Sequence, residues 1–250
     1  MDRFMRTELL LGQAAMERLQ AAHVAVFGLG GVGSFTAEAL ARSGVGRLTL
    51  IDKDTVDVTN INRQLIALSD TIGQAKVDVM ANRIASINPA CQVERYKLFF
   101  SAATAADVLT AQYDYIADAI DTISAKILLV LEAHARGTPI ICSMGAANKL
   151  DPSMFKVLDL HDTSVDPIAK VMRRELKKSG FFAPLPVVCS TETPLAPHYE
   201  YLPEPTGVET SPTRKQARPP ASVAFVPPVA GLLMAGHIVR QLVGLSSTGQ

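Results

Sequence analysis

Short apolar runs alternate with longer amphipathic stretches along the first 160 residues of the chain. The short runs have the length and composition of β-strands and span 23–27, 47–51, 92–97, 114–118, 138–143 and 154–160. Between them, apolar positions recur at helical spacing over 32–43, 74–87, 103–111 and 123–136. Strands that alternate with helices predict βαβ units. We therefore expect an α/β fold, with a doubly wound, mostly parallel sheet and helices on both faces. The last strand either continues this sheet or starts an antiparallel arm.

The pattern changes after residue 160. A basic amphipathic helix is predicted at 166–180. Segment 193–220 is too rich in proline for a regular element, which indicates a long mobile loop. The apolar stretch 221–244 is interrupted by a Pro-Pro pair, and the part after the pair is shorter than the ~20 apolar residues that span a bilayer. A buried terminal helix is therefore expected, in preference to membrane association through 229–244.

Composition sets further limits. The chain has 250 residues, of which 48% are hydrophobic, enough for a buried core without disulfides. We divide it into an N-terminal helical arm (1–22), a core (23–160) and a C-terminal part (161–250) of the same domain. Its 24 basic and 24 acidic residues cancel, so nucleic-acid binding would need a local patch. Three cysteines without a CxxC pair argue against a cysteine-ligated zinc, and the N-terminus lacks a secretory signal, so we expect a cytoplasmic protein.

A glycine motif follows the first predicted strand. Gly28, Gly30 and Gly33 have the GxGxxG spacing, Gly31 adds a fourth glycine, and Asp52 ends the second strand. In a strand–loop–helix, such glycines let the backbone approach phosphates, and the acid binds ribose hydroxyls. The motif predicts a Rossmann-like nucleotide site. By itself it does not separate the hydride carrier of an oxidoreductase from ATP.

The residues after Asp52 favour ATP. A hydride-transfer enzyme has no need of the run NINRQ (60–64) or of a lysine soon after it, whereas attack on the α-phosphate of ATP requires cations around the triphosphate. Arg63 can bind two phosphate oxygens through its guanidinium fork, Lys76 adds a point charge, and Asn60 is a third candidate. Each cation taken alone would also fit a solvated surface position.

Carboxylates close the fourth predicted strand, in the run DAIDT (118–122). The carboxyl edge of a parallel sheet faces the ligand crevice. Asp121 is therefore a candidate to hold Mg²⁺ against the phosphates, with Asp118 as a supporting acid. The alternative is that Asp121 caps a helix, and this motif alone favours neither role.

Six motifs occur in a fixed order, which is RFMR at 3–6, GLGGVGS at 28–34, DKDTVDVTNINRQ at 52–64, GQAK at 73–76, INP at 87–89 and DAIDT at 118–122. Over residues 3–160 this order resembles the superfamily of ubiquitin-activating, ThiF and MoeB enzymes, which adenylylate carboxylates with MgATP. The resemblance implies that 23–160 is an ATP-binding adenylylation core.

The resemblance also assigns roles to residues. The side chains that it implies in ATP binding are Asp52 at the ribose, Asp54, Asn60, Arg63, Lys76 and Asp121, the last of them with Mg²⁺. Arg6 is implied to reach into the site of a partner subunit as an arginine finger, in a homodimer. With Arg63, Lys76 and Asp121 it makes up the implied catalytic set. Arg3, the first arginine of the same motif, fits a structural role equally well.

The C-terminal part narrows the resemblance. Classical members of the superfamily carry two CxxC pairs for zinc, which this chain lacks. Its segments HDTSVDPIAKVMRRELKKSG, VVCSTETP and ASVAFVPPVAGLLMAGHIVRQLVG instead resemble the tRNA threonylcarbamoyladenosine dehydratases. This implies an ATP-dependent enzyme of the ligase type. In its reaction the threonyl carboxylate of a modified adenosine in tRNA attacks ATP, and the ureido oxygen of the same nucleoside then closes a ring and expels AMP.

Two alternatives stay open. A ThiF- or MoeB-like adenylyltransferase would activate the C-terminus of a ubiquitin-like carrier, with a sulfur-relay or carrier protein as partner. A dinucleotide-dependent oxidoreductase would bind NAD(H) and not ATP.

Basic residues near the C-terminus are candidate contacts for the tRNA backbone. On the predicted helix these are Lys170, Arg173, Arg174, Lys177 and Lys178, and in the proline-rich segment Arg214, Lys215 and Arg218. Basic patches bind phosphates without sequence specificity. On charge pattern alone, a solvated helix face is an equal alternative.

The cysteines are weighed as possible nucleophiles. Cys189, in the run VVCSTETP, could form a thioester as in ubiquitin-activating relatives. A lone cysteine is more often buried and inert, which is what we expect here. Cys91 and Cys142 adjoin predicted strands and are expected in the core.

Overall fold

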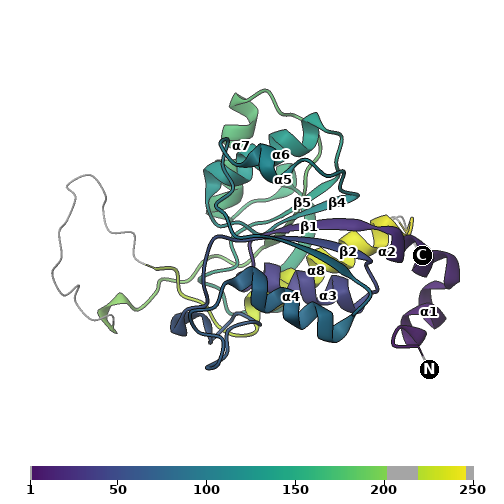
Figure 1. Ribbon diagram of the computed structural model, residues 1–250. Coiled ribbons are helices and arrows are strands. Elements are labelled where there is room, and N and C mark those ends of the chain that lie inside the picture. Colours follow the sequence, from purple (N-terminus) through teal and green to yellow (C-terminus); the bar gives the residue numbers. More distant parts are fainter. Residues whose placement is uncertain (1, 202–218, 246–250) are drawn as a thin grey trace.

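A sheet of seven strands runs through the centre of the computed structural model, which describes residues 2–201 and 219–245 (Figure 1). The strands are β1 (His23–Phe27), β2 (Arg47–Ile51), β3 (Gln92–Tyr96), β4 (Tyr115–Asp118), β5 (Ile140–Ser143), β6 (Phe155–Asp159) and β7 (Pro186–Ser190). Their order is β3-β2-β1-β4-β5-β7-β6, and only the pair β6–β7 is antiparallel. Because β1 lies between β2 and β4, the chain direction of the crossovers reverses there. This is the point at which such sheets form a ligand crevice.

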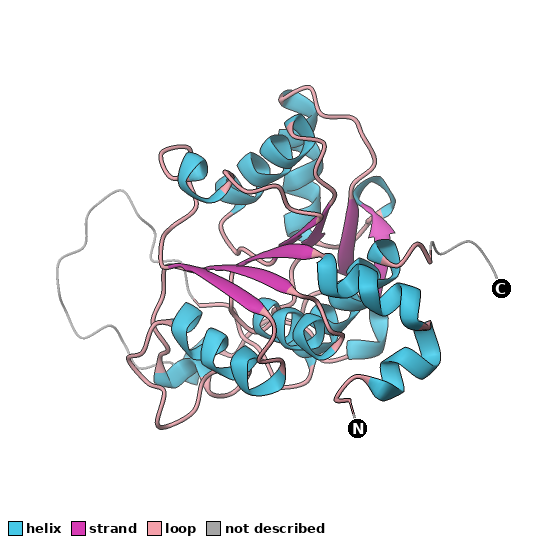
Figure 2. Ribbon diagram, turned by 45° about the vertical axis from the view of Figure 1, so that its right-hand side comes forward, coloured by secondary structure: helices cyan, strands magenta, loops and turns pink. Residues whose placement is uncertain are grey.

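Helices cover both faces of the sheet (Figures 1 and 2). They are α1 (Met5–Leu11), α2 (Gln13–Ala21), α3 (Gly33–Arg42), α4 (Lys76–Ile87), α5 (Ala105–Val108), α6 (Ile123–Ala135), α7 (Pro167–Lys178) and α8 (Val226–Leu242). One core lies between the sheet and α2, α3, α4 and α8, and a second lies between the sheet and α5, α6 and α7. Helix α1 buries none of its residues and stands at the edge of the molecule.

The central strands explain why two cores form. In β1, Val24 and Val26 belong to the first core, while Ala25 and Phe27 belong to the second. All five residues of β1 are buried, since side chains alternate between two covered faces. The continuous apolar run in the sequence is therefore the signature of a strand buried on both sides.

The predicted fold class is confirmed, with three differences in detail. The helix predicted over 103–111 is reduced to the single turn of α5. Strand β7, which contains the VVC run, was not predicted. It lies between β5 and β6 in the sheet, so that β6, the last predicted strand, pairs antiparallel with β7. The proline-rich segment contains a 3₁₀ turn at Tyr199–Tyr201. Residues 202–218 of that predicted loop, with the basic residues Arg214, Lys215 and Arg218, lie outside the described residues. The boundaries proposed at 22 and 160 stay predictions.

The terminal helix α8 is buried as predicted. It packs on α3 at close range, where the Thr36 hydroxyl donates a hydrogen bond of 3.1 Å to the carbonyl of Gly231. A Cβ added to Gly231 would lie 2.4 Å from the carbonyl oxygen of Val32, so only glycine permits this approach. Within 2–201 and 219–245, no helix is long and apolar enough to cross a membrane.

Candidate active site

A cavity of about 590 Å³ opens at the carboxyl ends of β1, β2 and β4. One part of its lining is apolar and comprises Phe27, Ile51, Leu98, Phe99, Phe100 and Ile120. The other part is polar and comprises Asp52, Lys53, Asp54, Asn60, Arg63, Gln64, Lys76 and Asp121. The volume and this division suit a ligand with a flat apolar ring and a charged chain.

Three of the four motif glycines line the cavity. Gly28 has a φ of 85°, and a Cβ there would lie 2.6 Å from the carbonyl oxygen of Ala119. A Cβ added at Gly30 would have only one neighbour within 4 Å, the side-chain amide nitrogen of Gln64 at 3.9 Å, so there is free space beside this glycine. Gly33 does not line the cavity, which differs from its predicted place among the binding residues. A Cβ at Gly33 would lie 1.8 Å from the Gly28 carbonyl oxygen, so this glycine permits the packing of α3 against the loop.

Asp52 lies at the end of β2 and faces the glycine loop. Its Oδ2 accepts a hydrogen bond of 2.6 Å from the backbone N–H of Leu29, and its Oδ1 accepts one of 2.8 Å from the N–H of Asp54. The acid predicted to bind ribose therefore also fixes the conformation of the loop that follows β1.

The predicted phosphate-binding side chains meet in the polar part. The Nζ of Lys76 lies 3.3 Å from Oδ2 of Asp54, and the Lys76 side chain is only 7% exposed. The guanidinium of Arg63 donates to the carbonyl of Thr59 at 2.9 Å, which holds its position beside the glycine loop. Asn60 is buried, and its Oδ1 accepts a hydrogen bond from the N–H of Asp57 as part of a capping box. The sequence separates these residues by up to 16 positions, and the turn that follows β2 brings them to one cavity.

The two acids of the DAIDT run have different surroundings. Asp121 is exposed and lines the cavity. Helix α6 begins after Thr122 without a side-chain cap, so the capping role considered for Asp121 is not observed. Asp118 is fully buried, and its Oδ2 lies 2.9 Å from the Nζ of Lys126. The structure gives no support for Asp118 as a supporting acid at Mg²⁺, because its carboxylate is buried in this ion pair.

Two groups of cavity residues were missed by the sequence reasoning. Gln64 is 7% exposed, and its Oε1 is a buried acceptor without a partner in the described structure. Gln64 is the last residue of the NINRQ run, and the motif that selected Asn60 and Arg63 could also have selected it. Residues 143–147 line the cavity after β5, and the same argument that singled out the end of β4 would have singled out this strand end.

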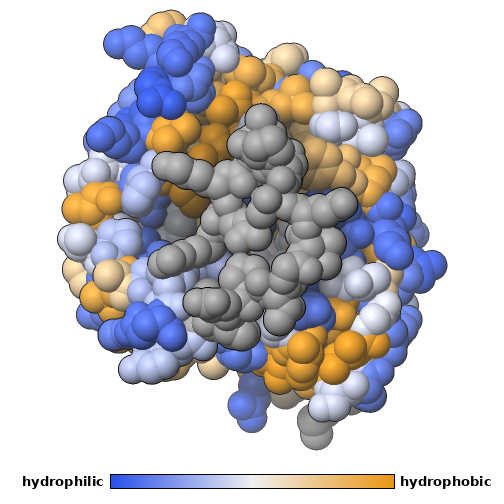
Figure 3. All heavy atoms as spheres, turned by 90° about the vertical axis from the view of Figure 1, so that its left-hand side faces the viewer, coloured by the Kyte–Doolittle hydropathy of each residue, from blue (hydrophilic) through white to orange (hydrophobic). Residues whose placement is uncertain are grey.

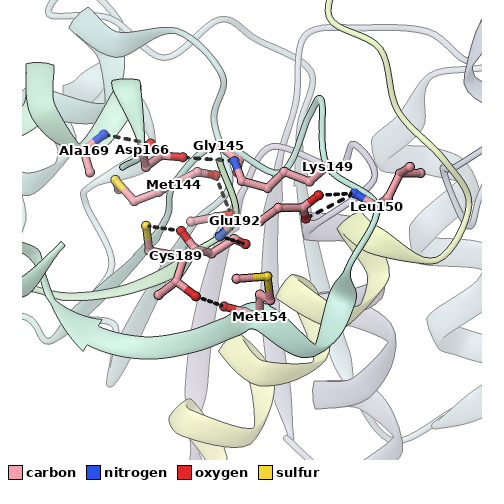
Figure 4. A network of polar contacts seen from close by, with 12 residues as sticks. Met144, Gly145, Lys149, Leu150, Met154, Asp166, Ala169, Cys189 and Glu192 are labelled. Carbon is pink, nitrogen blue, oxygen red and sulfur yellow. Dashed lines mark hydrogen bonds and ion pairs between the residues drawn. The ribbon is translucent and has the colours of Figure 1, made fainter. Parts of the chain in front are cut away.

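A buried ion pair supports the segment after β5 (Figure 4). The Nζ of Lys149 donates to the carbonyl of Gly145 at 2.7 Å and lies 3.3 Å from Oδ2 of Asp166, and both side chains are at most 1% exposed. The other oxygen of Asp166 accepts from the N–H of Ala169 and caps α7. This pair therefore joins the cavity wall at Gly145 to the start of α7.

Arg6 is exposed on α1 and does not line the cavity of its own chain. Arg3, three positions earlier in the sequence, donates a hydrogen bond of 2.5 Å to the carbonyl of Ile87, at the end of α4. The contact made by Arg3 supports the structural role considered for it.

The five basic residues of α7 are not equivalent. Arg173 is half-buried and donates to the carbonyls of Leu160 and Thr163 and to the Thr163 hydroxyl, so it is engaged within the chain. These hydrogen bonds anchor α7 and give no support to the predicted contact of Arg173 with tRNA. The other four are exposed; Arg174 and Lys178 pair with Glu175, whereas Lys170 and Lys177 have no ion pair within the described structure.

The three cysteines are free thiols, and all three are buried. Burial raises the pKa of the Cys189 thiol to about 11, with the carboxylate of Asp166 acting in the same direction. Burial likewise raises the pKa of Cys91 to about 11 and that of Cys142 well above its usual range. These values favour the inert alternative for Cys189.

Comparison with known proteins shows what this chain is similar to. The model of the ThiF family matches residues 2–249. The chain is 50% identical to the tRNA threonylcarbamoyladenosine dehydratase of Bacillus subtilis over 97% of its own length and 95% of that protein. It is 43% identical to the Escherichia coli dehydratase over 70% of this chain and 66% of that one. A solved structure of the Escherichia coli enzyme in complex with ATP superposes with a TM-score of 0.84, at 34% identity over 97% of this chain and 94% of that one.

The glycine loop, the acid that ends β2 and the cations of the NINRQ and GQAK runs thus occur in one cavity, in a chain that the family model matches from end to end. The chain belongs to the ThiF family.

Proposed function

We propose that this protein is an ATP-dependent enzyme that cyclises threonylcarbamoyladenosine in tRNA by adenylylating its threonyl carboxylate. The observation that carries the proposal is the cavity in which the apolar lining and the cations Arg63 and Lys76 adjoin the glycine loop. Similarity to dehydratases over nearly the whole chain supports the same substrate.

The apolar and polar linings suggest how ATP binds. The adenine ring lies against Phe27, Ile51 and the Phe99–Phe100 segment, and Asp52 accepts hydrogen bonds from the ribose. The triphosphate extends past the glycine loop toward Arg63 and Lys76, with the side-chain amides of Asn60 and Gln64 as further partners. Gly30 supports this placement, because an added Cβ there would project into free space.

Catalysis then rests on charge placement. The carboxylate oxygen attacks the α-phosphorus, pyrophosphate leaves, and an acyl-adenylate forms. Arg63 and Lys76 stabilise the negative charge that grows on the phosphate oxygens and on the leaving group. The ureido group of the same nucleoside attacks the activated carbonyl and loses its proton, and AMP departs with the former carboxylate oxygen. This second step is intramolecular and needs no enzyme nucleophile, in agreement with the protonated cysteines.

Mg²⁺ fits the acids of this cavity. Over the described ranges, no three His, Cys, Asp or Glu side chains converge to hold a metal by themselves. Nucleotide-bound Mg²⁺ takes only one or two carboxylates and uses phosphate oxygens for the rest. Asp121, exposed at the end of β4, would supply such a carboxylate, and the bound ion would neutralise charge on the departing pyrophosphate.

A homodimer is part of the proposal. Arg6 is exposed on a helix that also exposes Leu9 and Leu10, at 80% and 83%, which suits burial against a second copy. There Arg6 acts as an arginine finger in the partner's cavity. The test mixes Arg6→Ala with Arg63→Ala, each inactive alone; recovery of activity in the mixture supports action in trans, and no recovery contradicts it.

The tRNA backbone is proposed to contact α7 through the exposed cations Lys170, Arg174, Lys177 and Lys178. Replacing Lys170 and Lys177 by alanine should weaken tRNA binding and flatten its salt dependence. Lys156→Ala, a change of an exposed lysine on β6, is the control.

The direct test of the function is turnover. The protein incubated with MgATP and modified tRNA should yield AMP, pyrophosphate and the cyclic nucleoside, identified by mass spectrometry, while Arg63→Ala and Asp121→Ala should fail. Absence of the cyclic product from the unaltered protein overturns the proposal. Pyrophosphate exchange stimulated by a carrier that ends in Gly-Gly would point instead to carrier activation.

A further inference from the structure

A second cavity, of about 540 Å³, adjoins the active-site cavity. We call it the side cavity. Ser222 lines both cavities, and Ala147 of the first is followed directly by Asn148 of the second. In the same way, Pro220 lines the active-site cavity and Pro219 lines the side cavity. A wall of only a few residues therefore separates the two spaces.

Asn148 organises the floor of the side cavity. It is the non-glycine residue with a positive φ, 60°, in the part of the chain that the structure describes. Its backbone N–H donates to the carbonyl of Ala221 at 2.8 Å, and its Oδ1 accepts from the N–H of Ala221 at 2.9 Å. Its carbonyl accepts from the N–H of Leu195 at 2.8 Å. One asparagine in a left-handed conformation thus ties the chain at 195 to the chain at 221.

Further hydrogen bonds stabilise the segments that line the side cavity. The carboxylate of Glu192 accepts from the backbone N–H groups of Leu150 and Asp151, at 2.9 and 3.0 Å (Figure 4). On the active-site side, the Asn62 amide donates to the carbonyl of Ser222 at 3.0 Å, one residue from Arg63. The side cavity is therefore anchored to the phosphate-binding turn and to the segment after β5.

The walls of the side cavity suit a flat and neutral group. They include Tyr199, Leu195, Leu150 and Val223, with Pro197 and Pro219. The ammonium of Lys149 is buried against Gly145 and Asp166, and the Nδ1 of His198 lies 2.8 Å from Oε1 of the Glu200 carboxylate, so this lining does not favour an anion. The surface that faces the viewer in Figure 3 likewise carries groups of hydrophobic side chains among hydrophilic ones. In the lining of the side cavity, Leu150 and Leu195 remain 53% and 48% exposed, which leaves apolar surface to be covered.

We infer that the side cavity binds the nucleobase of a nucleotide next to the reacting adenosine, stacked against Tyr199. The inference rests on the proposed function, because a polynucleotide substrate carries a neighbouring base one phosphodiester link away from the reacting adenosine. Proteins that act on single-stranded RNA hold splayed bases by stacking on aromatic rings, and this needs no cation. The phosphate that joins the two nucleotides stays in solvent outside the side cavity.

The test uses RNA stem-loops that carry the modified adenosine, either intact or with an abasic site at one neighbouring nucleotide. For the unaltered protein, one of the two abasic positions should raise KM roughly 5- to 100-fold with kcat little changed, the range expected for loss of one base stack. Tyr199→Ala should raise KM for intact RNA by a similar factor, and the abasic site should then add nothing. Tyr201→Ala is the matched control, because Tyr201 is 81% exposed and does not line the side cavity. Val223→Trp, which narrows the side cavity, should act as Tyr199→Ala does.

A binding measurement gives an independent readout. With 2-aminopurine at the sensitive position, binding should quench fluorescence in the unaltered protein and in Tyr201→Ala, and not in Tyr199→Ala. Normal turnover with KM independent of both abasic sites and of Tyr199 overturns the inference and leaves the proposed function standing. No cyclic product from intact RNA overturns both. Loss of carrier-stimulated pyrophosphate exchange in Tyr199→Ala, with RNA turnover unchanged, assigns the side cavity to a protein and also overturns the inference.

Discussion

The carboxylate of Asp52 and the backbone N–H of Leu29 are joined by a hydrogen bond of 2.6 Å between Oδ2 and N. The end of β2 thereby holds the loop that follows β1, in the middle of the motif Gly28–Gly33. Since the same carboxylate is proposed to meet the ribose, nucleotide binding and loop conformation depend on one side chain.

Asp52→Ala should weaken ATP binding strongly, through loss of the ribose contact and of the bond that holds the glycine loop. Hydrogen bonds to a charged group contribute about 1.5–3 kcal/mol, so the Kd for ATP should rise roughly 10- to 100-fold. Titration calorimetry with ATP measures this, and Asp70→Ala, at an exposed position outside the cavity, is the control. Unchanged affinity in Asp52→Ala would show that the acid does not serve the nucleotide.

Substitution by alanine at two glycines of the same motif should impair different properties, ATP binding at Gly30 and thermal stability at Gly33. Gly30→Ala places its methyl group in the cavity with only a 3.9 Å contact, so the melting temperature should stay close to that of the parent while ATP binding falls. Gly33→Ala places its methyl group 1.8 Å from the Gly28 carbonyl oxygen, so it should lower the melting temperature. Thermal unfolding with and without ATP separates the effects. A Gly30→Ala protein that ATP still stabilises fully would contradict the proposed path of the triphosphate.

These glycines also illustrate what sequence can predict. The spacing of Gly28, Gly30 and Gly33, with Asp52 after the second run, was enough to predict the strand–loop–helix and its ligand class. It could not separate the glycines that line the cavity from Gly33, which serves packing, because that distinction depends on the distance between two backbones. Similarly, β7 was missed because it pairs with distant strands, as Val187 does with Cys142 of β5 and Val188 with Val157 of β6.

The buried pair of Lys149 and Asp166 should control the stability of the cavity wall. Lys149→Met leaves the Asp166 carboxylate buried without its partner, so the free energy of unfolding should fall by about 3–5 kcal/mol. The double variant with Asp166→Asn removes that charge and keeps the cap on α7, so part of the loss should be recovered. Urea unfolding measures both, with Lys156→Met as the exposed control. Equal stability of Lys149→Met and the control would contradict this account of the pair.

Cys189 should be dispensable and unreactive. With its pKa raised to about 11 by burial, only about one thiol in a thousand is ionised at pH 8, and alkylation should speed up about tenfold per pH unit until that pKa is reached. Iodoacetamide labelling followed by mass spectrometry tests this. Cys189→Ala should retain full turnover, and a trapped thioester at Cys189 would revive the nucleophile hypothesis.

The roles of the ionisable residues show where sequence reasoning reaches its limit. Arg63, Lys76 and Asp121 were selected by type and order, and the fold brings all three to one cavity. Asp118 and Arg173 looked equally suitable by type, yet each is engaged within the chain, by Lys126 and by the carbonyls around Thr163. The burial of a charged side chain and its ion-pair partner depend on residues that pack against it from distant parts of the chain, so the local sequence does not predict them.

The central claim is that a carboxylate of the RNA is adenylylated in this cavity. The most direct measurement uses modified RNA with oxygen-18 in the threonyl carboxylate and follows the label by mass spectrometry of the AMP formed. The account predicts that AMP carries one labelled oxygen and that the cyclic nucleoside has lost one. Unlabelled AMP would mean that water attacked ATP and that the carboxylate was never activated, and it would contradict the account.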